Sequence, residues 1–433
     1  MRRLTSWGRL DYPPQSVVHL GGMQYVPGQM AASEKPGVAH GMGRSYGDVC
    51  LNPGGTVWNT SACDAFIAFD EWSGRLVVEA GVLLRDIQRL LVPRGWMLPV
   101  TPGTQMVTVG GAIANDVHGK NHHRRGSFGH HVHHIRLLRS DGQVIDCGLD
   151  SHPDWFAATI GGLGLTGLIL QAEIQLMKVA GPWMATEMLT FDSLERFFQL
   201  ADESAAEWEY TVAWVDCVAR RGSRGLFIRG NHSDDTRSAH RASRALSMPF
   251  APPFSLVNRL SLRPLNLAYY TLGKWRAGPG SAHYEKFFYP LDGIGHWNRM
   301  YGPRGFYQYQ CLLPRERGLE VVSGILAEIA SAGDGSFLAV LKTFGSRVPA
   351  GLLSFAQEGV TLALDFPNRG ARTLALFDRL DALVLGDGGR LYPAKDARMP
   401  RAMFEAGYPG LRDFLKFRDP GISSGLSRRL MDS

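Results

Sequence analysis

The sequence lacks a long apolar run and has few cysteines. No stretch of about 18 uninterrupted apolar residues occurs in the 433 residues, which argues against a membrane-spanning helix. The N-terminal MRRLTSWGRL continues into DYPPQS without a signal-peptide core, so we expect a cytoplasmic chain that begins at or near Met1. The five cysteines are widely spaced and odd in number, which predicts reduced thiols rather than a disulfide framework or a structural zinc site.

Acidic residues are missing from one long stretch. Residues 237–284 carry seven lysines and arginines and no aspartate or glutamate, in a chain of net charge +6. The stretch contains SMPFAPPFSLVNRLSLRPLNLAYYTLGKW, whose prolines argue against one long helix. Its mixture of aromatic, leucine and arginine side chains is typical of a segment at a lipid headgroup layer. A long surface loop packed on its own domain is an equally weighted alternative.

The patterning of the chain predicts an α+β protein with two domains. Residues 1–180 contain short β-branched strands broken by glycine-rich turns, including a hairpin at Asp141-Gly142. In residues 181–388, amphipathic helical segments alternate with strands, which predicts a sheet covered by helices on one face. Near the end, the motif GGRLYPAKDARMP, residues 388–400, returns to strand-and-turn character.

Seven of the fourteen histidines fall in VHGKNHHRRGSFGHHVHH, residues 117–134. A metal site, a polyanion-binding patch and part of a cofactor loop are the three interpretations. On a strand, His131 and His133 share one face and His130 and His134 the other, and such pairs are too few for a metal without an acid or cysteine. We therefore expect no metal, and a polar surface strand at residues 130–134.

Three glycine-rich loops precede and follow this cluster: HGMGRSYGD, TPGTQMVTVGGAIAND and GGLGLTGLI. Glycines allow backbone amides to turn toward an anion, and Gly110-Gly111 permits close approach of a large flat ligand. We expect a short strand at residues 107–109 and a helical turn from Ala112 to Asn115. Each loop alone is a weak signal, but together they indicate one dinucleotide site.

These motifs resemble a known family. GMGRSYGD, PGTxxVTVGGAIAxDxHGKNHH, GSFG and GLTG are similar to the flavoenzymes of the vanillyl-alcohol-oxidase type, and more closely to the decaprenylphosphoryl-β-D-ribose 2′-oxidases. The likeness extends through LTSWGR, YGPRGFYQYQ, LKTFG, LDFP and GGRLYPAKDAR, which is nearly the whole chain. The fold that it implies is a flavin domain from both chain ends, residues 1–180 and 389–433, with a substrate-capping domain, residues 181–388, inserted between them.

The resemblance also implies the cofactor residues. Many relatives attach FAD covalently through a histidine of the first glycine loop, whereas the corresponding loop here offers Tyr46, so we expect noncovalent FAD. The implied contacts run from the pyrophosphate through the ribityl chain and flavin ring to the adenine end: Gly43, Arg44, Ser45, Tyr46, Gly47, Gly103, Thr108, Val109, Gly110, Gly111, Asn115, Val117, His118, Ile169 and Tyr392.

The implied catalytic and substrate residues come from three parts of the chain. Lys395 matches the family lysine near the reacting carbon, and His118 and Lys120 continue the flavin loop, where they can stabilise negative charge. For the substrate, the resemblance and the residue types indicate Trp214, Gln308, Gln310 and Lys342. Residues 122–125, two histidines and two arginines, are expected at the mouth, where they would attract a phosphate. Some members carry cysteine where this chain has Ala363, so no chemistry is assigned there.

The activity implied is oxidation of the 2′-hydroxyl of a polyprenylphosphoryl-β-D-ribofuranose to the 2′-keto sugar, the first half of epimerisation to an arabinofuranose donor for cell-surface glycans. The expected partners are a separate NAD(P)H-dependent short-chain reductase, a quinone or other electron acceptor, and the membrane surface, with the chain peripheral at the inner membrane and no nucleic acid bound. An FAD-dependent oxidase of a soluble polyol or aldonolactone is one alternative. A polyanion-binding module without catalysis is another.

Overall fold

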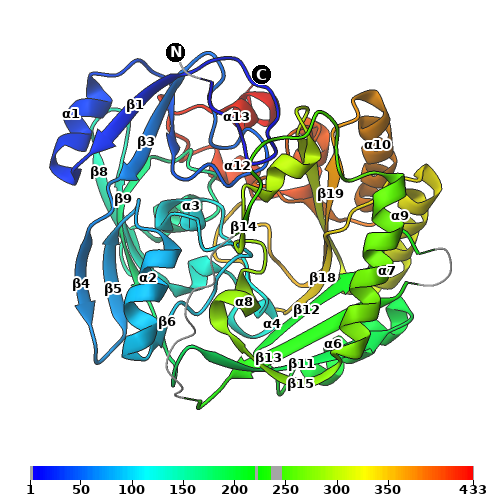
Figure 1. Cartoon of the computed structure of the whole chain (residues 1–433). Helices are drawn as coiled ribbons and strands as arrows, with labels where there is room; N and C mark the ends of the chain where they lie inside the picture. Colours follow the sequence, from blue (N-terminus) through cyan, green and yellow to red (C-terminus); the bar gives the residue numbers. More distant parts are fainter. Residues whose placement is uncertain (1–2, 220–222, 236–245, 433) are drawn as a thin grey trace.

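The computed structural model describes residues 3–219, 223–235 and 246–432. Two N-terminal sheets lie on one side of the molecule and a large sheet lies on the other (Figure 1). The first N-terminal sheet is parallel, in the order β1 (Ser16–Gly21), β3 (Thr56–Ala62), β2 (Gly37–His40). The second is antiparallel, in the order β4 (Phe66–Asp70), β5 (Arg75–Glu79), β9 (Leu168–Gln175), β7 (Val132–Leu138), β8 (Val144–Gly148).

Short helices connect the strands of these two sheets. β7 and β8 form the expected hairpin, and Gly142 at its turn has a φ of 91°, a left-handed conformation that glycine adopts without strain. A two-stranded pair joins β6 (Trp96–Met97) to β10 (Met177–Lys178). The helices of this region are α1 (Val26–Ala31), α2 (Leu84–Leu91), α3 (Val109–Ala114), α4 (His122–Arg125) and α5 (Pro153–Thr159).

The large sheet is antiparallel and has eight strands. Its interior strand β19 (Gly359–Pro367) is buried along almost its whole length, which explains its mainly apolar sequence GVTLALDFP. The strands lie in the order β15 (Gly278–His283), β11 (Trp183–Phe191), β13 (Gly225–His232), β12 (Tyr210–Val215), β18 (Ala339–Phe344), β19, β17 (Phe306–Leu313), β20 (Arg390–Leu391).

Helices cover both faces of this sheet, so the prediction of helices on one face is wrong. On the outer face lie α6 (Leu194–Ser204), α9 (Gly318–Ala332) and α10 (Ala371–Gly386). On the inner face lies α7 (Arg259–Trp275), whose Tyr269 ring packs 4.8 Å from the Trp214 ring of β12. Pro264 lies inside α7, so proline did not prevent a 17-residue helix here. Asn258 begins it, because its side chain accepts hydrogen bonds from two backbone N–H groups of the first turn.

The two ends of the chain meet (Figure 1). After β20 come α11 (Arg401–Gly407), α12 (Leu411–Phe414) and α13 (Gly425–Leu430), and this segment returns to the parallel sheet, where Gly37 N–H donates to the Gly421 carbonyl at 3.0 Å. Arg429 forms ion pairs with Asp48 and Asp396, each at 3.0 Å. We propose on this basis a flavin domain of residues 1–180 and 389–433 and a cap of residues 181–388. Within the described chain, no helix combines the length and apolar character needed to cross a bilayer.

Candidate active site

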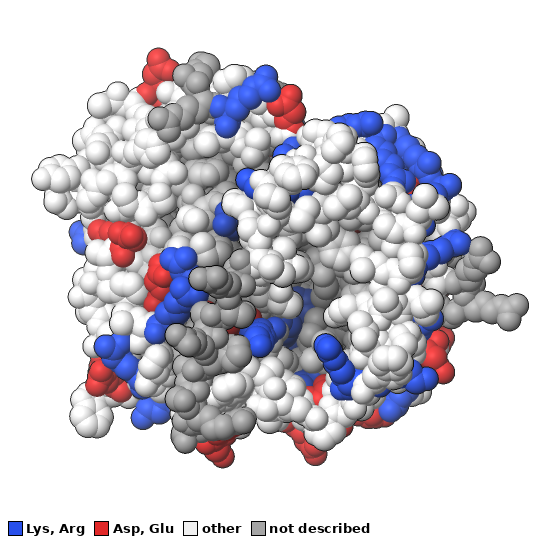
Figure 2. Space-filling model, viewed as in Figure 1, with Lys and Arg blue, Asp and Glu red and all other residues white. Residues whose placement is uncertain are grey.

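A cavity of about 970 Å³ lies between the N-terminal sheets and the inner face of the large sheet. The molecule is hollowed at this place, and basic side chains lie inside the hollow (Figure 2). Its volume is at the upper end of the roughly 300–1,000 Å³ of small-molecule sites, so it has room for a large ligand. All three glycine-rich loops contribute to its wall, together with β12, β17, β18 and the segment after β20.

Nearly all of the residues expected at the site line this one cavity. They include the lysines at 120, 342 and 395, the two glutamines of β17, Trp214 and most of the cofactor residues. Two do not. Val109 is fully buried in the core of the second N-terminal sheet. Gly47 lies behind the wall, where a Cβ atom would come 1.8 Å from the Asp396 carbonyl oxygen.

Close approach between loops explains two of the glycines. A Cβ atom at Gly41 would lie 2.6 Å from the Thr108 hydroxyl, so the first glycine loop touches the second directly. At Gly47, the first loop touches the segment that carries Lys395. The loops are therefore parts of one wall, because only glycine permits both contacts.

The second glycine loop begins a helix earlier than expected. Residues 107–109 were predicted as a strand, and this is wrong: Thr108 is the N-cap of α3, with its hydroxyl accepting from Gly111 N–H at 3.1 Å. Gly110 then packs against Ala80, and its N–H donates to the Ala80 carbonyl at 2.8 Å. The threonine cap outweighs the β-propensity of the valines on either side.

The wall presents polar atoms that fit a flavin nucleotide. Gln105 Oε1, Asn115 Oδ1 and His118 Nδ1 are buried side-chain atoms of the cavity wall without a hydrogen-bond partner in the described chain. A buried polar atom without a partner costs free energy, so a ligand with matching donors and acceptors would bind here favourably. The glycine loops, the large volume and these atoms together suit FAD.

Three half-buried lysines line the cavity, at residues 120, 342 and 395. Burial, with Lys342 as a secondary cause, lowers the pKa of Lys120 to about 7, and burial together with Lys395 lowers that of Lys342 to about 7. Lys120 Nζ donates to the Phe287 and Phe288 carbonyls at 2.5 and 3.0 Å, and Lys342 Nζ donates to the Gly119 carbonyl at 3.3 Å. These contacts tie Lys120 to the end of α8 (Tyr284–Phe288) and Lys342 to the loop that follows α3.

Lys395 lies in a small buried cluster. Burial lowers its pKa to about 8, and the negative charge of Asp365 opposes that shift. Its Nζ lies 4.1 Å from the centre of the Tyr46 ring, which packs edge-on against Phe306. The Tyr46 side chain, expected near the FAD pyrophosphate, therefore points toward the lysine.

Asp365 is a residue that the sequence prediction missed. It is fully buried on β19, and its Oδ1 accepts from Gln308 Nε2 at 2.6 Å while its Oδ2 has no partner among the described residues. Burial raises its pKa to about 7, although Gln308 and Lys395 both oppose the rise. The motif LDFP contained a signal for this residue. It places an acid in a strand that is otherwise apolar, and a carboxyl group in a buried strand needs a polar partner.

His118 and Gln310 form a second contact across the cavity. Gln310 Nε2 lies 3.1 Å from His118 Nε2 and 3.2 Å from the Thr361 hydroxyl, so the amide donates to a neutral imidazole. Burial and the nearby Lys342 hold the pKa of His118 well below its usual range. Gln308 and Gln310 both line the cavity, as the alternation of a strand predicts. Trp214 Nε1 donates to the Phe337 carbonyl at 2.8 Å, which fixes the indole in the wall.

The histidines at residues 130 and 131 have structural roles. His130 and His131 lie in a 3-10 turn, Phe128–His131, so the predicted strand begins only at Val132. His130 Nδ1 accepts from Ser127 N–H at 3.0 Å, and its imidazole thereby helps to close the turn. No group of three or more potential metal ligands occurs among the residues that the structure describes.

Residues 122–125 do not lie at the cavity mouth, and this prediction is wrong. His122 is buried with its ring 4.3 Å from Phe344, and Arg125 pairs with Glu209 at 2.8 Å. Arg124 also pairs with Glu209, at 3.5 Å. A single acid neutralises much of this basic cluster and ties α4 to the cap, a contact between distant residues that local sequence does not reveal.

Comparisons with known proteins agree with this site. The FAD binding domain model matches residues 28–148. The chain is 36% identical to the decaprenylphosphoryl-beta-D-ribose oxidase of Mycolicibacterium smegmatis, over 99% of this chain and 97% of that protein. It is 35% identical to an uncharacterized protein of Streptomyces coelicolor, over 81% of this chain and 100% of that protein. The L-gulonolactone oxidase of Mus musculus is 29% identical over 46% of this chain and 44% of its own.

Three findings lead to one assignment: the near-complete coverage, the FAD binding domain, and the cavity that joins the three glycine loops to half-buried lysines. The chain belongs to the decaprenylphosphoryl-beta-D-ribose oxidase family and is an FAD-dependent oxidoreductase.

Proposed function

We propose that the protein oxidises the 2′-hydroxyl of a polyprenylphosphoryl-β-D-ribofuranose to the 2′-keto sugar. The observation that carries the proposal is that one cavity joins the glycine loops to Lys395, Gln308 and Gln310. The full-length likeness to an enzyme named for decaprenylphosphoryl ribose supports this substrate class. FAD, when bound, supplies the two-electron oxidation of the alcohol carbon.

Lys395 is the group that we propose to take the hydroxyl proton. A base must reach the hydroxyl directly and have a pKa close to the working pH, and burial brings the pKa of Lys395 down to about 8. Asp365 balances part of the charge when Lys395 becomes protonated, and the Tyr46 ring holds the Nζ atom from one side. The proton therefore moves from the sugar oxygen to Lys395 Nζ.

The other residues are proposed to orient the substrate. Gln308 and Gln310 present amides to the sugar hydroxyls, and Trp214 forms a flat apolar wall. Lys342 and Lys120 attract the phosphate, which would raise their pKa values above about 7 and keep both cationic. His118, held neutral, hydrogen-bonds Gln310 and keeps that amide turned toward the cavity.

Cofactor attachment and partners complete the proposal. We propose noncovalent FAD, held by the glycine loops and by the polar atoms of Gln105, Asn115 and His118. A quinone or other acceptor would take the electrons, and a separate NAD(P)H-dependent short-chain reductase would reduce the keto sugar to the arabinose configuration. The lipid-linked substrate implies work at a membrane surface.

Oxidation of a soluble polyol or aldonolactone is less well supported. The lactone oxidase of Mus musculus matches less than half of this chain, whereas the ribose oxidase matches nearly all of it. Lys120 and Lys342, which both line the cavity, also suit a phosphate, which polyols and lactones lack.

Product trapping tests the proposal. The holoenzyme is incubated with farnesylphosphoryl-β-D-ribofuranose and an electron acceptor, and the product is reduced with borodeuteride. We expect deuterium at carbon 2 of the sugar, in a mixture of ribose and arabinose. Deuterium at another carbon, or unlabelled ribose alone, would contradict the assignment.

A further inference from the structure

The surface of α7 is apolar on the side that faces outward. Ten of the 21 exposed large apolar side chains of the described chain lie between Leu246 and Trp275. Leu260, Leu267 and Trp275 are 88%, 51% and 79% exposed, and their spacing places them on one face of the helix. The opposite face, with Leu262, Asn266 and Gly273, is buried. An exposed apolar stripe of this kind marks a contact surface.

The helix cannot rotate to bury its apolar outward face, because contacts fix its inner side to the rest of the cap. Asn266 Nδ2 donates to the buried Asp216 at 2.9 Å, and Asp216 also pairs with Arg224 at 2.8 Å. A Cβ atom at Gly273 would lie 2.2 Å from the Leu226 side chain, so the helix touches the sheet there. The stripe is therefore a built feature of the cap.

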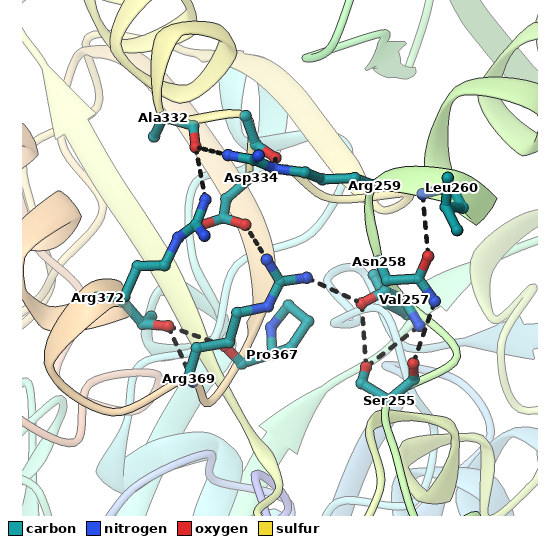
Figure 3. Close-up of polar contacts among 12 residues, drawn as sticks. Ser255, Val257, Asn258, Arg259, Leu260, Ala332, Asp334, Pro367, Arg369 and Arg372 are labelled. Carbon is teal, nitrogen blue, oxygen red and sulfur yellow. Dashed lines mark hydrogen bonds and ion pairs between the residues drawn. The ribbon is translucent and has the colours of Figure 1, made fainter.

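The N-terminal end of α7 is held by a cluster of arginines (Figure 3). Arg259 donates to the Ala332 and Gly333 carbonyls at the end of α9, both at 2.6 Å. Arg372 donates to the same Ala332 carbonyl at 2.8 Å and pairs with Asp334 at 3.0 Å. Arg369 pairs with Asp334 as well. Two arginines thus share one carboxylate, while Arg259 contacts only backbone carbonyls, so this end of the helix carries excess positive charge.

The segment that carries the stripe has charged side chains of one sign only. Residues 246–284 contain four basic residues, at 259, 263, 274 and 276, and no acid. Two of these basic residues lie along the flank of the stripe. Arg263 follows Leu260 by three residues, and Lys274 directly precedes Trp275. Uncharged atoms dominate the surface where α7 lies, with basic atoms toward its borders (Figure 2). An apolar stripe bordered by cations complements a bilayer that contains anionic lipids.

The same helix reaches the active-site cavity. Tyr269 and Arg276 line the cavity wall, next to Trp214 of β12. A substrate whose prenyl chain remains in a bilayer could therefore pass its phosphoryl sugar inward along α7. We propose that the outward face of α7, with Leu260, Leu267 and Trp275, docks on an anionic lipid bilayer. This inference rests on the proposed lipid-linked substrate.

Vesicle flotation of the holoenzyme tests the docking surface. We expect it to float with vesicles of equal parts phosphatidylcholine and phosphatidylglycerol, and to float less with phosphatidylcholine alone or at high salt. The triple variant Leu260→Ser, Leu267→Ser, Trp275→Ser should bind the anionic vesicles at least about tenfold more weakly, because each side chain inserted in the bilayer contributes through the hydrophobic effect. Trp72, which is 94% exposed in the turn between β4 and β5, provides the control, and Trp72→Ser should float like the unmodified protein. Both strands lie on the opposite side of the molecule from α7 (Figure 1).

Activity separates this inference from the proposed function. The triple variant should oxidise farnesylphosphoryl ribose free in solution at the normal rate and the decaprenyl substrate in vesicles more slowly. Unchanged flotation of the triple variant would overturn the docking surface, while oxidation of the soluble substrate would leave the function intact. Light scattering provides a second test. If the unmodified protein were a dimer and the triple variant a monomer, the docking surface would also be overturned, because the stripe would then be a subunit contact. Failure of the unmodified protein to oxidise either substrate would instead overturn the function.

Discussion

At the scale of single residues, the account depends most on Lys395. Replacement by methionine keeps the length of the side chain and removes the proton acceptor. We expect kcat to fall about 10²–10⁴-fold with flavin content unchanged, because general-base catalysis contributes that much. Steady-state kinetics with a soluble prenylphosphoryl ribose measure it. Lys416→Met, on an exposed surface pair with Asp413, is the control and should leave kcat unchanged.

The pKa of Lys395 sets an expected pH dependence. The lysine must be neutral to accept a proton, so kcat/KM should rise with pH through about 8. Asp365 raises that pKa, so Asp365→Asn should move the rising limb to lower pH. Asp365→Glu retains the charge and should keep the limb near its original position. A pH profile of Asp365→Asn that falls in height without moving would show that Asp365 acts only in folding.

From the sequence, the identity of the residues that line the cavity was easier to predict than the contacts between them. Lys395, Gln308 and Gln310 were recognised because each belongs to a motif, and all three line the cavity. The cluster of Tyr46 and Asp365 with Lys395 was not predicted. Its members come from three separate segments, and only the folded chain brings them together.

At the scale of elements, the contact between the first glycine loop and the segment after β20 leaves the least room for an added side-chain atom. Gly47→Ala would place a methyl group 1.8 Å from the Asp396 carbonyl oxygen, so one segment must move. We expect a loss of at least about 2 kcal/mol of stability and a lower ratio of flavin to protein. Thermal unfolding and the absorbance spectrum measure these.

Gly28→Ala is the matched control for this change. Gly28 lies in α1, and a Cβ atom there meets no atom within 4 Å. Alanine should leave flavin content unchanged and stabilise the protein slightly, because it reduces the freedom of the unfolded chain. If both variants lose flavin equally, close packing at Gly47 is not what holds the site together.

Two departures from the sequence-based expectation have different causes, one local and one tertiary. At Thr108 a single hydroxyl cap began a helix among β-branched residues, and at Pro264 a helix continued through a proline. In α7, contacts from Asn266 and Arg259 to other elements stabilise the helix. Such tertiary contacts override local propensity, and periodicity alone does not contain them.

At the scale of the whole molecule, the return of the C-terminus to the N-terminal sheet joins the two ends of the chain. Arg429 lies between Asp48 and Asp396, both buried. Arg429→Met would leave two carboxylates close together without a cation, and we expect a loss of about 3 kcal/mol of stability. Chemical unfolding measures it, with Lys416→Met as a surface control that should behave like the unmodified protein. An unchanged midpoint for Arg429→Met would show that apolar packing alone closes the ends.

The α+β class was predictable at this scale, because strands and amphipathic helices have different periods. The proposal that both chain ends contribute to the flavin domain came from family resemblance, and no local pattern indicated it. The order of the eight-stranded sheet, with β20 beside β17, depends on pairings between distant segments. Periodicity identifies individual strands and does not identify their partners.

Flavin reduction under anaerobic conditions tests the central claim most directly. The purified protein should show a flavin absorbance spectrum, and FAD should be released on denaturation because no covalent bond is expected. Addition of farnesylphosphoryl-β-D-ribofuranose without any acceptor should bleach the visible band at one equivalent, while xylitol and an aldonolactone should leave it unchanged. A colourless protein that does not take up FAD, or bleaching by xylitol or the lactone but not by the prenylphosphoryl sugar, would contradict the account.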